Sequence, residues 1–258
     1  EQLRSGDVLV GHVEVPHTSR GRQMNFDVPA PASDPANLAA LARAGFHVAT
    51  LAGNHIADAG PEGVTDTVSE LQRIGIQTTG AGATLAMARR PAILERRGIR
   101  IGVLSYNCVG PRESWAGASR AGCAYVHVLT HYELNYASPG GPPEVYTFAD
   151  PSSLEAMIAD IEELRPTVHV VMVALHKGMG HTPATVAMYE RQIAKAAIDA
   201  GADVNAREQH QQTAIMWAAA EGHTDVVRQL MDAGADMRAG LPSGWKIGRA
   251  SCRERSVD

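Results

Sequence analysis

The sequence predicts an α/β fold over its first 200 residues, and three observations carry this prediction. Apolar runs of strand length lie at 46–51, 99–106 and 167–175. Segments with apolar residues at helical spacing separate these runs, and such alternation is typical of sheets covered by helices. The 258 residues are 45% hydrophobic and 20% charged, which suits a globular chain with a large core.

The clearest helix is expected at 61–74. Val64 and Leu71 lie on one helical face there, Pro61 occupies the first turn, and Gly75 follows the last residue. The alternating, valine-rich residues 7–15 predict the first strand of the fold. The remaining elements are expected as strands at 46–51, 99–106 and 167–175 and as helices at 36–44, 153–164 and 183–200.

Residues 110–143 are expected to form a long surface excursion that borders a site. They hold many Gly, Pro, Ser and Tyr residues and show no helical or strand period. The three cysteines of the chain, Cys108, Cys123 and Cys252, are too few and too irregularly spaced for a disulfide framework or a thiolate metal site.

The charge pattern argues against nucleic acid or anionic lipid as a partner. The net charge is -5, and Lys and Arg are scattered along the chain instead of clustered. The sequence has no run of 18 apolar residues, and its first residues lack the pattern of a signal peptide. We therefore expect no signal or transmembrane segment in this chain, and the missing initiator Met leaves room for one lost upstream.

Polar side chains that suit metal chemistry follow two of the predicted strands. Asn54, His55 and Asp58 come directly after the strand at 46–51, and His176 ends the strand at 167–175. Open α/β sheets bind ligands beyond the carboxyl ends of their strands. Amide and carboxylate oxygens combined with imidazole nitrogen suit Mn, Fe, Zn or Mg, and a divalent ion of this kind can activate water for hydrolysis.

Each of these residues also has a purely structural interpretation. A single His after a strand, such as His176, is more often a hydrogen-bonded structural residue than a metal ligand. Asn54 and His55 could serve only as turn residues, and Asp58 only as a carboxylate near a helix N-terminus. Glu14 and His12, on the predicted first strand, could simply face solvent.

Three short motifs stand out along the chain: Gly11-His12-Val13-Glu14, Gly53-Asn54-His55-Ile56-Ala57-Asp58-Ala59-Gly60 and His176-Lys177-Gly178. They resemble the CapA family of bacterial capsule and poly-γ-glutamate synthesis. The family carries a short acidic strand motif, then Asn-Asn-His-x-x-x-Asp-x-Gly, His-Trp-Gly and Gly-His-His-Pro-His loops. The resemblance covers roughly residues 3–203, and the loop with Gly60 is the most specific of the matching elements.

The resemblance implies a layered, calcineurin-like metallophosphatase-type sandwich and a metal-dependent, phosphatase-like hydrolase. It implies a phosphorylated or polyanionic polymer of the bacterial cell envelope as substrate. The implied metal-facing residues are Glu14, Asn54, His55 and His176, of which His55 and His176 would be catalytic, and the implied supporting residues are His12, Gly53, Asp58 and Gly60.

The chain departs from the family pattern at several positions. His12 stands where the family has Asn, and Lys177 stands where it has Trp. The early Asp ligand of the family is expected before residue 1, and no Gly-His-His-Pro-His segment follows Asp203. Because coordination number and geometry determine affinity, we expect an incomplete site that binds metal weakly and a fragment without activity.

Residues 213–230 resemble an ankyrin repeat. Asp-Ala-Gly-Ala-Asp occurs at 199–203 and again at 232–236, a spacing of about 33 residues, which is the ankyrin period. One repeat cannot bury its own apolar face, so we expect it to be marginal unless it docks on the α/β domain. Such a segment would bind a protein partner.

The predicted organisation is a truncated metallophosphatase-type domain at 1–203, a small all-α ankyrin-like segment at 204–240 and a tail at 241–258. From about Lys246 the tail resembles a reading frame of a sequencing adapter, so it is expected to be disordered and artefactual.

Three functions stay open: a metal-dependent hydrolase whose bound metal is lost in His55→Ala, an ankyrin-type interaction module, and a chimera joined near Asp203 that has no physiological function.

Overall fold

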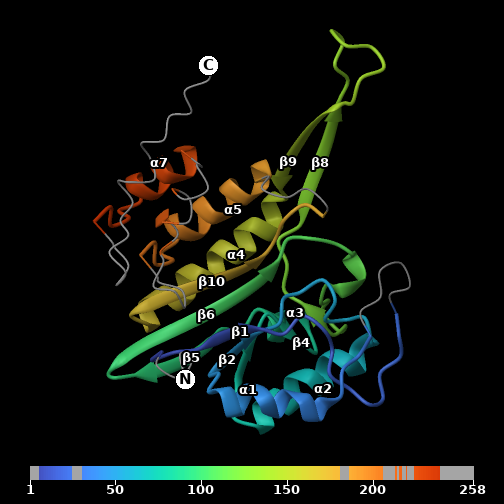
Figure 1. The fold of residues 1–258 in the computed structure, drawn as a ribbon, viewed down its shortest axis with the longest axis vertical. Helices are drawn as coiled ribbons and strands as arrows, with labels where there is room; N and C mark the ends of the chain where they lie inside the picture. Colours follow the sequence, from blue (N-terminus) through green and yellow to red (C-terminus); the bar gives the residue numbers. More distant parts are fainter. Residues whose placement is uncertain are drawn as a thin grey trace, which may run out of the picture.

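The computed structural model describes residues 6–24, 31–180, 186–205, 213, 215–216, 219 and 224–238 (Figure 1). Its strands are β1 Val10–His12, β2 Val48–Thr50, β3 Gln77–Thr79, β4 Ala81–Gly82, β5 Ala92–Arg96, β6 Ile99–Asn107, β7 Gly122–Cys123, β8 Val128–Glu133, β9 Glu144–Ala149 and β10 Val170–His176. Its α-helices are α1 Ala39–Ala44, α2 Gly60–Arg73, α3 Leu85–Ala88, α4 Pro151–Leu164, α5 Met188–Asp199 and α7 Thr224–Asp232.

Two three-stranded sheets form the centre of the fold. The first sheet has the order β1-β2-β3, and all its strands are parallel. The second has the order β10-β6-β5, in which β10 and β6 are parallel and β5 is antiparallel to β6. In Figure 1, α4 and α5 cover the second sheet, and α1 and α2 lie beside the first.

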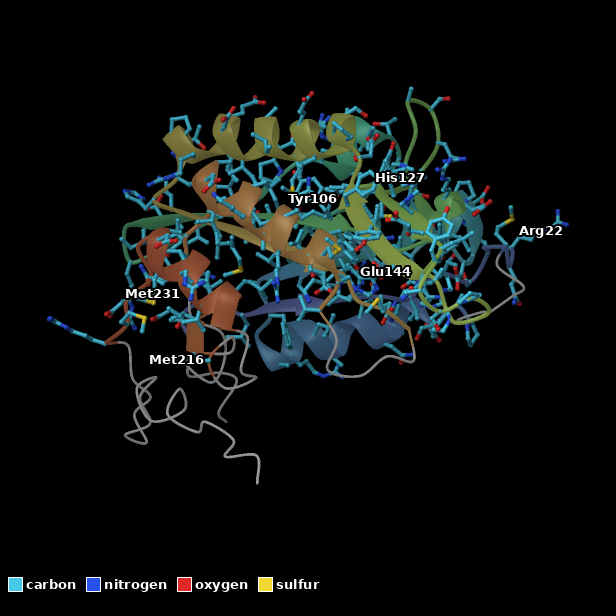
Figure 2. The ribbon with its side chains drawn as sticks, turned by 90° about the horizontal axis from the view of Figure 1, so that it is seen from above. Arg22, Tyr106, His127, Glu144, Met216 and Met231 are labelled. Atoms are coloured by element: carbon cyan, nitrogen blue, oxygen red, sulfur yellow. The ribbon has the colours of Figure 1, made fainter. Side chains whose placement is uncertain are left out.

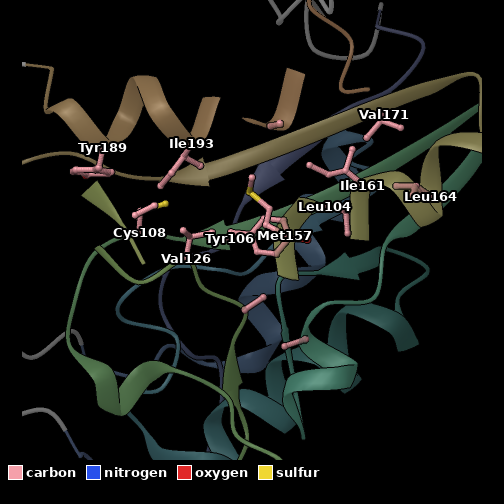
Figure 3. Close-up of a cluster of buried hydrophobic side chains, with 14 of the residues drawn as sticks. Leu104, Tyr106, Cys108, Val126, Met157, Ile161, Leu164, Val171, Tyr189 and Ile193 are labelled. Atoms are coloured by element: carbon pink, nitrogen blue, oxygen red, sulfur yellow. The ribbon is translucent and has the colours of Figure 1, made fainter. Parts of the chain in front are cut away.

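Alternation along the strands divides the core into layers. Leu104 and Tyr106 of β6 pack with Met157 and Ile161 of α4 and with Ile193 of α5, as Figure 3 shows. Val103, the neighbour of Leu104 in β6, points the other way, into a cluster between the two sheets. This cluster consists of Val48, Ala92, Leu94 and Val103, with Val8, Val10, Ile101 and Met172 packed against it. A third cluster joins β2 to the helices beside the first sheet through Ala49, Leu38, Val64 and Leu71. The layers are therefore helices, sheet, sheet and helices, and the predicted layered α/β class is confirmed.

Caps explain where the main helices begin. The side chain of Asp34 accepts a hydrogen bond from the Ala36 backbone, and the predicted helix at 36–44 opens as a 3-10 turn at Pro35–Leu38 before α1. Asp150 accepts a hydrogen bond from Ser153 N and caps α4 in the same way. Gly45 ends α1 with a φ of 93°, a left-handed conformation that suits glycine.

Part of the prediction for 110–143 was wrong. The segment contains a 3-10 turn at Arg112–Ser114, the short strand β7 and the longer strand β8, which pairs with β9 in the projecting hairpin of Figure 1. Cys123, Ala124 and Val126 are buried, because β7 pairs with β4 and carries the chain back through the core. Strands β3, β4, β5 and β9 and helix α3 were not predicted, and β1 is shorter than expected.

Some predictions lie outside the described residues. They include the start of the helix at 183–200, of which the structure describes α5, and the tail at 241–258 with Lys246 and Cys252. In the part of the chain that the structure describes, no helix is both long and apolar enough to cross a bilayer.

Candidate functional site

His12 and His176 meet at the carboxyl ends of the two sheets. His12 ends β1 in the first sheet and His176 ends β10 in the second. Each side chain points into the space between the sheets, because Val10 and Met172 on the same faces pack in the inter-sheet cluster. The two imidazole rings stack with 5.1 Å between their centroids.

Asn54 and Glu14 complete this cluster. The Oδ1 of Asn54 lies 2.9 Å from Nε2 of His176, and Oε1 of Glu14 lies 3.5 Å from the same nitrogen. An amide oxygen only accepts hydrogen bonds, so Nε2 of His176 carries the proton in this arrangement and would have to release it to coordinate an ion. Three kinds of metal ligand that suit a divalent ion therefore lie close together: a carboxylate, an amide oxygen and an imidazole.

His55 is held by Asp58 beside this cluster. The Nδ1 of His55 lies 2.7 Å from Oδ2 of Asp58, whose side chain is 3% exposed. A buried carboxylate that accepts from Nδ1 fixes the tautomer and leaves Nε2 of the ring as the acceptor. Asp58 therefore orients the ring of His55.

Two glycines leave room for these side chains. A Cβ atom at Gly53 would lie 3.0 Å from Nε2 of His12 and 3.3 Å from Cγ of Glu14. Gly60, the first residue of α2, has a φ of +77°, where a side chain is strained. The Gly53 position is thus tight for any side chain, and the Gly60 position favours glycine for its backbone conformation.

Burial keeps the two stacked histidines neutral near pH 7. Partial burial, and after it the neighbouring His176, lower the pKa of His12. Burial also lowers the pKa of His176, while Glu14 acts in the opposite direction. Neutral imidazoles are the form that binds metal ions.

The loop after His176 is fixed by the first turn of α5. The backbone N–H of Gly178 donates to the hydroxyl of Tyr189 at 2.9 Å, and that hydroxyl donates to the Gly178 carbonyl at 3.2 Å. The ammonium of Lys177 pairs with the carboxylate of Glu190, which is 4% exposed and also accepts from Ala187 N. Lys177 follows His176 on an extended chain, so its side chain leaves on the α5 side.

The donor chemistry fits a divalent ion, with few ligands. Among the described residues, no group of three or more His, Cys, Asp or Glu side chains is placed to hold a metal. Glu14 and His176 are two donors of those types, and Asn54 supplies the third through its amide oxygen. His55 is engaged with Asp58.

Sequence reasoning missed three residues of the site. The hydroxyl of Thr50 lies 3.1 Å from Nδ1 of His12 and orients that ring. Tyr189 and Glu190, both buried, anchor the loop after His176. A polar residue in an otherwise apolar strand was the available signal for Thr50, whereas the two α5 residues look like an ordinary first turn in the sequence.

Known proteins resemble parts of the chain. Two probable polyglutamine synthesis accessory proteins from two strains of Mycobacterium tuberculosis are each 48% identical to it over 86 residues, which is 32% of this chain. The matched segment spans 22% of the length of each of these relatives. A NAD nucleotidase from Haemophilus influenzae aligns in structure with a TM-score of 0.31 and 18% identity, over 56% of this chain and 22% of that one.

Two family profiles match the sequence along most of its length. Residues 210–240 match the ankyrin repeat. Residues 1–206 match the bacterial capsule synthesis protein PGA_cap, and these residues include every side chain of the cluster around His176. The chain therefore belongs to the bacterial capsule synthesis protein family.

Proposed function

We propose that the cluster of Glu14, Asn54 and His176 binds a divalent ion and that this site acts on a phosphorylated or polyanionic envelope polymer. The observation that carries the proposal is the convergence of these three donors where the two sheets end. Membership of a capsule synthesis family supports a role in capsule or poly-glutamate synthesis in the bacterial envelope.

We propose a separate role for each residue of the site. Glu14, Asn54 and His176 would hold the ion, and His12 would support His176 by stacking on it. A bound divalent ion would supply Lewis-acid polarisation of a phosphate ester and a water of lowered pKa. His55 would move a proton at Nε2, because Asp58 accepts from Nδ1 and can stabilise the ring when it is charged.

The geometry also limits the proposal. Lys177 is paired with Glu190 and directed toward α5, so it does not add a cation to the site. Three donors give a weaker site than a complete coordination shell. We therefore propose low affinity, with Mn, Fe, Zn or Mg as the candidate ions.

Calorimetric titration of the full chain with Mn²⁺ and with Zn²⁺ tests the site. We expect one weak binding event that His176→Ala and Asn54→Ala each abolish. His131→Ala is the matched control, because His131 lies on the exposed hairpin strand β8 and should leave binding unchanged. Binding that survives both site variants would contradict the proposed ligands.

Hydrolysis of an aryl phosphate ester, measured with the metal at saturation, separates binding from catalysis. If the chain binds metal and hydrolyses the ester, His55→Ala should reduce the rate while leaving metal affinity nearly intact. If it binds metal without hydrolysis, the phosphatase part of the proposal fails and the metal site stands.

A second function, protein binding, is favoured by the ankyrin match at 210–240. We infer that α7, with the turn that follows it to residue 238, contributes to this surface. Cross-linking to a partner through α7 should be lost in Met231→Asp, because Met231 is an exposed apolar side chain of that helix.

A further inference from the structure

Two turns of the chain, 33 residues apart, have the same backbone geometry. At the end of α5, Gly201 N donates to Ile198 O at 3.0 Å and Ala202 N donates to Ala197 O at 2.9 Å. At the end of α7, Gly234 N donates to Met231 O at 2.9 Å and Ala235 N donates to Leu230 O at 2.8 Å. Both glycines have positive φ, and each turn closes on an aspartate, Asp203 or Asp236, that accepts from the backbone N–H two residues later.

The first turn belongs to the capsule-family region and the second to the ankyrin repeat, yet they pack together. Ile198 and Val204 contact the buried cluster of the C-terminal segment, which consists of Ile215, Met216, Ala219, Leu230 and Ala235. Asn205 joins the two turns, since its Oδ1 accepts from Asp236 N at 2.7 Å and its Nδ2 donates to Gly234 O at 3.3 Å.

The same turn is tied to the second sheet on its other side. Asp203 N donates to the carbonyl of Val171 in β10 at 3.0 Å. Ala197 is buried in the cluster that packs α5 on this sheet, one residue before Ile198 faces the ankyrin segment. Helix α5 therefore has one face in the α/β core and its last turn in the ankyrin core.

The 33-residue repeat identifies the residues of the ankyrin segment that correspond to Ile198 and Val204. One period after Ile198 and Val204 lie Met231 and Met237. Ile198 and Val204 are partly buried under the ankyrin segment, whereas Met231 is 46% and Met237 is 39% exposed. Figure 2 shows Met231 and Met216 at one end of the molecule, with Arg22 at the opposite end.

We propose that α5 and its turn serve as the first unit of an ankyrin-type stack, and that Met231 and Met237 form the docking face for one further ankyrin-type repeat. We infer this occupant because Met231 and Met237 hold the same positions in their turn as Ile198 and Val204 do in theirs. Ile198 and Val204 pack against an ankyrin-type segment, so a segment of the same kind would fit on Met231 and Met237. The expected partner presents small apolar residues and Met, as Ala219 and Met216 do at the covered interface.

One position differs between the two turns and sharpens the proposal. The equivalent of Asn205, whose amide oxygen accepts from Asp236 N, is Arg238. Arginine has no acceptor atom, so a repeat docked on Met231 and Met237 would lack this hydrogen bond. Arg238→Asn should therefore tighten the docking.

The first half of the proposal is tested by amide exchange of the full chain. In Val204→Asp we expect Gly234 and Ala235 to lose protection while β6 and β10 keep theirs. Met237→Asp is the matched control one period later and should leave protection unchanged. If Val204→Asp leaves Gly234 and Ala235 protected, or if Ile198→Ala, a milder change, also has no effect on them, α5 is not part of the stack.

The second half is tested by inserting a second copy of residues 206–238 after Arg238 in the full chain. Peroxide oxidation of Met231 and Met237, followed by mass spectrometry, should slow to the rate of the buried Met157, while exposed Met188 stays fast. Met237→Asp in the inserted chain should abolish the protection of Met231, and Arg238→Asn should increase it. Unchanged oxidation after insertion overturns the docking face. So does protection that appears in the parent chain as its concentration rises, since the occupant would then be a second copy.

Discussion

At the scale of single residues, Gly53 shows how closely the candidate site is packed. We expect Gly53→Ala to weaken binding of a divalent ion by about tenfold or more, because the added Cβ would displace His12 or Glu14. Calorimetry on the variant measures the change. Gly117→Ala is the control, since its Cβ would meet Arg120 at an ordinary 3.5 Å, and an equal loss in both variants would contradict the steric explanation.

His47 gives a pH dependence of folding. Burial, and then the nearby Arg96, lower the pKa of His47 from its usual 6.5, and its Nδ1 accepts a hydrogen bond from Leu9 N at 3.0 Å. Below pH 6.5 the unfolded chain takes up a proton that the folded chain resists, so the free energy of unfolding falls as the pH is lowered. Urea unfolding at pH 7.5 and pH 5.5 should show a smaller fall for His47→Gln than for the parent chain. Equal falls would exclude His47 as a contributor.

Much of the site was predictable at this scale, and the reason is chemical. Asn54, His55 and His176 stand out because polar groups directly follow buried strands. That His12 stacks on His176 could not be predicted, because it depends on how two sheets approach one another. The pairing of Lys177 with Glu190 was equally hidden, since a lysine beside a site residue looks like a ligand-binding cation until its direction is known.

At the scale of elements, helix α5 holds the loop that follows His176. We expect Tyr189→Phe to cost about 1 kcal/mol of stability and to expose the Gly178 amide to faster exchange, because the hydroxyl both accepts from and donates to that residue. Denaturant unfolding and amide exchange measure the two effects. Tyr146→Phe is the control, because its hydroxyl donates to the exposed Glu144 of the hairpin, and a similar cost there would argue against a specific role for Tyr189.

Elements with strong periodicity or caps were predicted, and short ones were not. Helices α2 and α4 have apolar faces and proline in the first turn, so the bounds predicted from the sequence lie close to those in the structure. Strands β3, β4 and β7 have three residues or fewer, too short for an alternating pattern to show. β8 and β9 form a projecting hairpin with apolar and polar residues exposed on both faces, so alternation gives no signal there either.

At the scale of the whole molecule, the apolar contact between the two sheets contributes to the stability of the fold. Val103 is fully buried in that contact, and Val103→Ala should lower the free energy of unfolding by about 2 kcal/mol, from the two lost methyl groups and the cavity they leave. Denaturant unfolding measures it. Val145→Ala, on the exposed hairpin, should change stability by less than about 0.5 kcal/mol.

The layered arrangement followed from the alternation of elements, whereas the partition of residues between layers did not. Met172 and Val173 are both apolar, yet the first faces the other sheet and the second faces the helices. In a strand buried on both faces, composition does not tell one face from the other.

The meeting of the two sheets at His12 and His176 also sets an order of events during synthesis. Asn54 and His176 are 122 residues apart in the chain, so the ribosome adds His176 roughly 6 to 24 s after Asn54 at typical bacterial elongation rates. Until β10 has been synthesised, the nascent chain lacks one of the three proposed ligands. On this assignment of ligands, the site can be complete only after the last strand of the second sheet has been made.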